Sequence, residues 1–210
     1  ALEARCADLE RLTLPFPDWL RRVLAVCPRD GAPGFAHLAR AGFVAAALLR
    51  SAVRAGLLTE ERRAALMESL PGLGFMLTDA AVAVREGRMS RTSLIDRFGH
   101  LRPGTYDIST PAYRDRPEAY LDPIIATAHS RVATPFKWTD GERTALDSAL
   151  AILNLGIDAE GLLRFVHTAV EGREYAKFVF TRLLSAALDN LAVQGRVAGI
   201  AADRLASMPL

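Results

Sequence analysis

Cysteine is scarce in this chain of 210 residues, which contains only Cys6 and Cys27. Neither belongs to a Cys-x-x-Cys pair, and neither has histidine neighbours at metal-ligand spacing. A structural zinc site or a disulfide framework needs several such residues in a regular pattern. We therefore expect no metal site in this chain and a reducing, cytoplasmic location.

A strong charge of either sign is also missing. Lysine and arginine total 26 against 24 aspartate and glutamate residues, which gives a net charge of +2. So small an excess provides no basic field that would attract nucleic acid or anionic lipid. The longest uncharged apolar run, residues 41–49, is far shorter than the roughly 20 residues that a membrane span needs. We expect neither nucleic acid nor a membrane as a partner.

The motifs of self-sufficient enzymes are absent as well. The sequence has no glycine-rich phosphate loop, no serine nucleophile elbow and no His-Glu-x-x-His zinc helix. We therefore expect no catalysis by this chain on its own.

What the sequence does contain is helical periodicity from end to end. Apolar residues recur at helical spacing in successive segments, and no segment shows the alternation of a strand. We predict an all-α, multi-helix bundle that forms a single helical domain over residues 1–210, with an irregular loop around residues 99–117. Because the helical pattern is already present at Ala1, we expect the chain to be a piece of a longer multidomain protein.

Local signals predict where several helices begin and end. Thr59, Ser90 and Thr139 are predicted N-caps, and Glu142 completes a capping box with Thr139. Gly99 is predicted to end a helix in the left-handed conformation that glycine adopts readily.

Two further predictions concern the first third of the chain. The proline and the two glycines of residues 29–34 predict a turn, and the helix before it is predicted to end before Pro28. The alanine-rich segment from Phe35 to Ala55 is apolar around much of its circumference, so we predict a central, nearly buried helix there.

The most informative segment is residues 97–107, which holds an imidazole, a carboxylate and two guanidinium groups between two helical patterns. Arg102 can form bidentate contacts with a phosphate or a carboxylate. His100 can exchange a proton near neutral pH, and Asp107 can orient it. Tyr106 adds a flat apolar face with a hydroxyl. We predict a pocket for a polar or anionic ligand; the alternative is a structural loop whose His and Asp satisfy nearby backbone groups.

A second polar group lies in residues 171–178. Arg173 and Lys177 are four residues apart and therefore share one helical face, and Glu174 is close enough to pair with Lys177. We predict that these three side chains lie opposite the loop and bind the same ligand. The alternative is a solvated helix face that carries an ordinary ion pair.

These two segments also carry a resemblance. Residues 97–108 read Arg-Phe-Gly-His-Leu-Arg-Pro-Gly-Thr-Tyr-Asp-Ile, with Tyr113 and Arg114 after them, and this stretch resembles a signature of bacterial phosphoenolpyruvate synthase-like proteins. Residues 171–182 are similar to a second characteristic stretch of the same proteins. The resemblance covers roughly residues 35–190.

The resemblance implies a domain of a multidomain phosphotransferase of the pyruvate phosphate dikinase type, related to rifampin phosphotransferase. In such enzymes an ATP-grasp domain binds ATP and Mg²⁺, and a histidine of a swivelling domain carries the phosphoryl group to an acceptor. Neither the ATP-grasp part nor the Gly-Gly-x-x-Ser/Thr-His segment is found in this chain. The expected role is therefore that of the helical, acceptor-binding domain, with the other two domains as partners and no cofactor of its own.

Residue roles are implied by the same resemblance. His100 or Asp107 would take the proton of the acceptor hydroxyl, and Arg102 and Tyr106 would bind the acceptor, with Arg173, Glu174 and Lys177 opposite them. The acceptor itself is left open between pyruvate, an antibiotic hydroxyl and another alcohol. Two alternatives of other classes are a non-catalytic helical scaffold that docks neighbouring domains and a free-standing helical ligand-binding protein.

Overall fold

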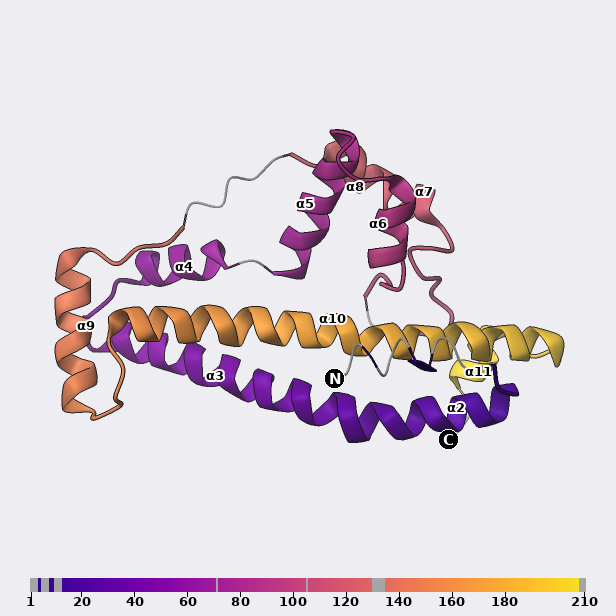
Figure 1. The fold of residues 1–210 in the computed structure, drawn as a ribbon, viewed down its shortest axis with the longest axis horizontal. Coiled ribbons are helices and arrows are strands. Elements are labelled where there is room, and N and C mark those ends of the chain that lie inside the picture. Colours follow the sequence, from indigo (N-terminus) through magenta and orange to yellow (C-terminus); the bar gives the residue numbers. More distant parts are fainter. Residues whose placement is uncertain are drawn as a thin grey trace. The chain divides into compact units, whose positions relative to one another are not determined.

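The computed structural model describes residues 4, 8–9, 13–70, 72–104, 106–129 and 135–207. These residues form helices and loops and contain no strand, which confirms the predicted all-α class (Figure 1). Cys6 and Thr105 lie outside the described residues. Along the chain the elements are α2 (Phe16–Val26), η1 (Cys27–Gly31), α3 (Ala32–Arg54), α4 (Glu60–Ser69), α5 (Leu73–Arg85), α6 (Arg91–Phe98), α7 (Pro117–Tyr120), α8 (Asp122–Thr127), α9 (Asp140–Ile152), α10 (Ala159–Val197) and α11 (Ala202–Ala206).

The chain divides into two compact units. The first unit comprises Ala1–Pro33, Phe75–Ser130 and Lys177–Leu210, and the second comprises Gly34–Gly74 and Arg131–Ala176. The long helix α10 contributes its N-terminal part to the second unit and the rest to the first.

The core of the second unit forms where α3, α4, α9 and the N-terminal part of α10 meet. Leu49, Leu66 and Val166 are among its fully buried residues. Trp138 packs into the same core, and its indole Nε1 donates a hydrogen bond to the Ala159 carbonyl oxygen at 3.0 Å, which ties the start of α10 to the loop before α9.

The predicted helix starts are confirmed. The hydroxyl of Thr59 accepts a hydrogen bond from the backbone of Arg62 at 3.2 Å, and that of Ser90 accepts one from Ser93 at 3.0 Å. Thr139 and Glu142 form the complete capping box, with Glu142 accepting from the Thr139 backbone at 2.8 Å. These devices satisfy backbone N–H groups that the first helical turn leaves free.

The turn predicted for residues 29–34 is wrong, and so is the helix end predicted before Pro28. The segment is helical: η1 is a π-helical turn that joins α2 to α3 without a break, and the Ala32 N–H bonds to the Cys27 carbonyl oxygen. Pro28 lies in η1 and Pro33 at the start of α3; inside a continuous helical stretch each proline removes one helical hydrogen bond, and a π turn is where such an interruption is commonly accommodated. The wider π turn thus carries the helix through a sequence that resembles a turn.

The nearly complete burial predicted for the Phe35–Ala55 helix is also wrong. Helix α3 buries one stripe of small residues and Leu49, whereas Phe43 is 68% and Val44 51% exposed. The stripe recurs every three or four residues, as expected for a helix that packs on one side only. By length and composition alone, the helical stretch Phe16–Arg54 could also cross a membrane, a test that core helices and signal sequences pass as well.

In the first unit, α6 and the C-terminal part of α10 pack together. Leu94 and Phe98 of α6 are fully buried, and the rings of Phe98 and Phe178 lie 5.5 Å apart. Gly99 ends α6 in a right-handed conformation, with φ −64°, so the left-handed cap predicted for it is wrong. Glycine is needed there for a close approach, because a Cβ would collide with the Ile95 carbonyl oxygen and lie 2.9 Å from the Cβ of Arg114.

Candidate functional site

The loop that follows α6 is closed at its neck by two backbone hydrogen bonds. The Tyr113 N–H donates to the Leu101 carbonyl oxygen at 2.8 Å, and the Arg114 N–H donates to that of Gly99 at 2.9 Å. The close contact of Gly99 with Arg114 lies at this neck. The stretch after α6 that resembles the signature therefore forms a loop whose two ends are held together. This loop is the irregular segment predicted from the sequence.

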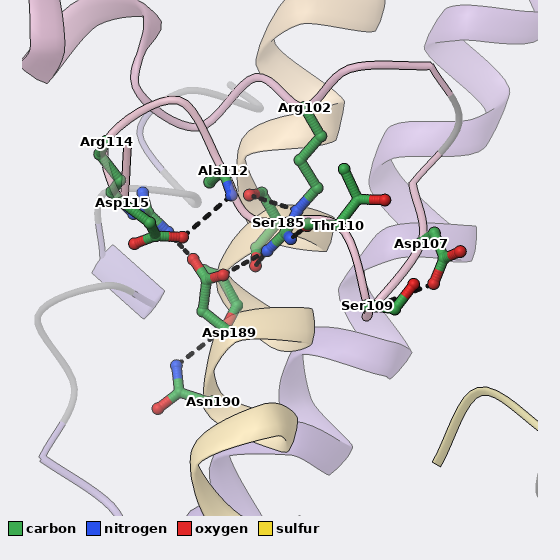
Figure 2. Close-up of polar contacts among 11 residues, drawn as sticks. Arg102, Asp107, Ser109, Thr110, Ala112, Arg114, Asp115, Ser185, Asp189 and Asn190 are labelled. Atoms are coloured by element: carbon green, nitrogen blue, oxygen red, sulfur yellow. Dashed lines mark hydrogen bonds and ion pairs between the residues drawn. The ribbon is translucent and has the colours of Figure 1, made fainter. Parts of the chain in front are cut away.

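Arg102 fastens this loop to α10. Its side chain is only 2% exposed, and its guanidinium donates to the Thr110 carbonyl oxygen within the loop (Figure 2). On α10 it donates to the hydroxyl of Ser185 at 3.3 Å, to the Ser185 carbonyl oxygen at 3.4 Å and to the carboxylate of Asp189. A buried guanidinium with so many acceptors holds the loop in one arrangement.

Asp189 receives a second arginine as well. One carboxylate oxygen accepts from Arg102, and the other accepts from Arg114, whose side chain is 38% exposed (Figure 2). Asp189 thus bridges a buried cation and a half-exposed one. This role was not predicted, because a single aspartate on a helix surface has no local signature.

His100 is buried beside the same helix. It is 2% exposed, its ring lies edge-on to Phe178 with centroids 4.7 Å apart, and its Nε2 donates to the Phe178 carbonyl oxygen at 3.1 Å. Burial, together with the positive charge of Arg182, lowers the pKa of His100 to about 4. The ring is therefore neutral at pH 7, and its Nδ1 is buried with no hydrogen-bond partner in the part of the chain described.

Tyr106 and Asp107 differ in their surroundings. Burial raises the pKa of the Tyr106 hydroxyl, and a hydrogen bond with Thr181 of α10 partly offsets this. Asp107 is exposed and accepts the backbone N–H of Ser109 at 2.8 Å, which lowers the pKa of its carboxyl (Figure 2). The contacts of Asp107 and His100 with backbone groups are those of the structural-loop alternative.

The second predicted group is divided. Arg173 pairs with Glu174, with its Nε and one terminal nitrogen 3.1 Å and 2.8 Å from the same carboxylate oxygen, and both belong to the second unit. Lys177 belongs to the first unit and has no ion pair in the described residues, so the predicted pairing of Glu174 with Lys177 is not found. A single cleft that holds these residues together with Arg102 stays a prediction.

The loop forms one wall of an open cavity of about 590 Å³ within the first unit. Its lining residues come from the loop, the last turns of α10 and the start of α11: Arg102, Ile108, Ser109, Pro111, Arg114, Asp115, Arg116, Asp189, Ala192, Val193, Arg196 and Ala202. Four arginines face two aspartates here, so the cavity is positive. Of these arginines only Arg102 was predicted; Arg114 and Arg116 lie just after the signature, but Arg196 is far away in sequence.

Among the described residues, no group of three histidine, cysteine, aspartate or glutamate side chains is arranged to hold a metal ion. Comparison of the chain with known protein families gives no match, and comparisons with curated proteins and with solved structures give none either.

Proposed function

We propose that the chain is the acceptor-binding helical domain of an ATP-dependent phosphotransferase that passes the phosphoryl group through a phosphohistidine. The resemblance of residues 97–108 and 171–182 to phosphoenolpyruvate synthase-like proteins motivates the proposal. The observation that carries it is that the first of these stretches is fixed by Arg102 and Asp189 as the wall of an arginine-lined cavity.

Such a wall suits phosphoryl transfer for a physical reason. The charge that develops on a phosphoryl group in transfer is stabilised by cations that are already in place. Arg102 is held by acceptors on two sides and needs no rearrangement, while Arg114 is partly exposed toward the cavity. ATP and Mg²⁺ would be bound by a separate ATP-grasp domain, so the chain alone would not turn over.

The two residues predicted to take the acceptor proton are not equally accessible. Asp107 is an exposed carboxylate, whereas both ring nitrogens of His100 are buried and one of them already donates to Phe178. In the proposed function Asp107 is therefore the accessible proton acceptor of the two, and it lies next to Ile108 and Ser109 of the cavity wall. His100 holds the loop against α10.

Phosphoryl transfer tests this proposal. In a polypeptide that joins the chain to ATP-grasp and phosphohistidine domains, Arg114→Ala should slow phosphorylation of an acceptor such as pyruvate or rifampin at least tenfold, because a charge-assisted hydrogen bond is worth about 1.5–3 kcal/mol. Formation of the phosphohistidine should be unchanged. Equal rates of acceptor phosphorylation in the variant and the wild type would show that the cavity takes no part in the reaction.

One observation favours the docking-module alternative. Around the end of α9, Ile152 is 85% and Leu153 63% exposed, beside a largely apolar cavity of about 310 Å³ in the second unit. In that alternative these side chains bind the nucleotide-binding or phosphocarrier domain. Ile152→Asp would then slow phosphoryl transfer between the domains, formation of the phosphohistidine included, and leave small-molecule binding unchanged, whereas Arg114→Ala should leave formation of the phosphohistidine unchanged.

A further inference from the structure

Two of the four arginines in the cavity of the first unit have no ionic partner in the described residues. Arg102 and Arg114 share Asp189, and Asp115 accepts the backbone N–H of Ala112 at 2.9 Å. Arg116 and Arg196 line the same cavity, are exposed, and form no ion pair within the part of the chain described. The cavity therefore retains positive charge that the protein does not neutralise.

The rest of the lining is mostly apolar and small. Ile108 and Pro111 come from the loop, and Ala192, Val193 and Ala202 come from α10 and α11. A ligand that fits such a site carries negative charge at one end and a small apolar body at the other. The volume of about 590 Å³ is sufficient for a small organic molecule.

We propose that this cavity binds a phosphate monoester with a small apolar body, with the phosphate held by Arg116 and Arg196. One dianionic phosphate neutralises both unpaired guanidinium groups, whereas a monocarboxylate would leave one of them unpaired. Phosphate also offers three terminal oxygens with several lone pairs each, so the two arginines can each bind it bidentately, with one oxygen accepting from both. Asp189 already pairs with Arg102 and Arg114, whereas no carboxylate pairs with Arg116 or Arg196 in the described residues.

A phosphate monoester is also what an acceptor alcohol becomes when it has been phosphorylated. As a product site, the assignment rests on the proposed function; as an anion site, it stands without it. The two can therefore fail separately.

Phenyl phosphate is a suitable probe. Benzoate is the comparison with a similar apolar ring but a single negative charge, and inorganic phosphate is the comparison without an apolar group. Calorimetric titration of the 210-residue chain at constant ionic strength should show saturable binding of phenyl phosphate, tighter than that of either other probe. Arg116→Ala and Arg196→Ala should each weaken it about tenfold to a hundredfold, the loss of one charge-assisted contact.

Arg164→Ala is the matched control, because Arg164 is exposed on α10 in the second unit and its removal changes the net charge equally. It should leave binding unchanged. Circular dichroism of each variant shows that the helices are intact.

The outcomes separate the two proposals. The phosphate site is wrong if benzoate binds as tightly as phenyl phosphate, or if binding does not saturate. It is also wrong if Arg164→Ala weakens binding as much as Arg116→Ala and Arg196→Ala do. If phenyl phosphate binds as expected but the joined polypeptide phosphorylates no acceptor, the site stands and the phosphotransferase role is wrong. If an acceptor is phosphorylated and Arg116→Ala and Arg196→Ala change nothing, the site is wrong and the role stands.

Discussion

Replacing Asp189 with asparagine should destabilise the first unit strongly. The change removes the carboxylate that pairs with Arg102, whose side chain is 2% exposed, and with Arg114, whose side chain is 38% exposed. A buried charge that loses its partner typically costs about 3–5 kcal/mol of folding free energy. We expect about 3 kcal/mol for Asp189→Asn, because Asp189 is itself 26% exposed and Arg102 keeps its contacts with Thr110 and Ser185.

Urea unfolding followed by circular dichroism measures this loss. Asp140→Asn is the matched control, since it removes an ion pair with Arg143 in which the carboxylate is 94% exposed. Exposed pairs contribute about 0–1 kcal/mol, so the control should remain close to the wild type.

A second substitution identifies the cause of the loss. If the cost comes from the stranded charge of Arg102, then adding Arg102→Met to Asp189→Asn should restore at least about 1 kcal/mol, because no cation is then left buried. The reasoning is refuted in either of two cases. In the first, the free energy of unfolding of Asp189→Asn lies within about 0.5 kcal/mol of that of the control. In the second, adding Arg102→Met lowers the free energy of unfolding further, as an independent destabilising substitution would.

Three further predictions concern the loop and the second unit. Gly99→Ala should destabilise by about 1–3 kcal/mol in urea unfolding, because its Cβ collides with the backbone at Ile95, whereas Gly141→Ala, with open space around it in α9, should be neutral or stabilising. His100 has a folded-state pKa of about 4, so the unfolded chain binds the proton first; stability should fall on the order of 2 kcal/mol from pH 7 to pH 5, and His100→Phe should remove that part of the pH dependence. The hydrogen bond from Arg62, with the capping N–H of Thr139, lowers the pKa of Glu142 to about 2; Glu142→Gln should cost about 1–2 kcal/mol at pH 7, and the difference from the wild type should shrink as the pH falls below about 4 toward 2.

Much of the fold was predictable because its signals are local. The caps at Thr59, Ser90 and Thr139 depend on residues within one helical turn, and each was predicted correctly. The π turn η1 was missed because residues 29–34 contain the glycines and the proline that are typical of a turn. Its helical form goes with a contact distant in sequence, the close packing of Gly31 against the ring of Phe180.

The site was predictable only on the loop side. Arg102, His100 and Tyr106 were predicted to contribute to a site, and each contacts α10, but the partners there lie about eighty residues away in the chain. Nothing local marks Ser185 or Asp189 as the acceptors of a buried arginine. Burial also changes the role of His100. The sequence predicted a proton acceptor, but in the structure the imidazole is buried.

The two compact units are interleaved along the polypeptide, because the chain passes between them after Pro33, Gly74, Ser130 and Ala176. Neither unit is a continuous stretch of sequence, and the last of these passages lies inside α10. A truncated gene can therefore express neither unit alone without cutting that helix or leaving segments of the other behind. Separate study of either one would require new linkers in place of the segments that belong to the other unit. A nascent chain on the ribosome likewise has to expose the segment from Lys177 onward before the first unit can form.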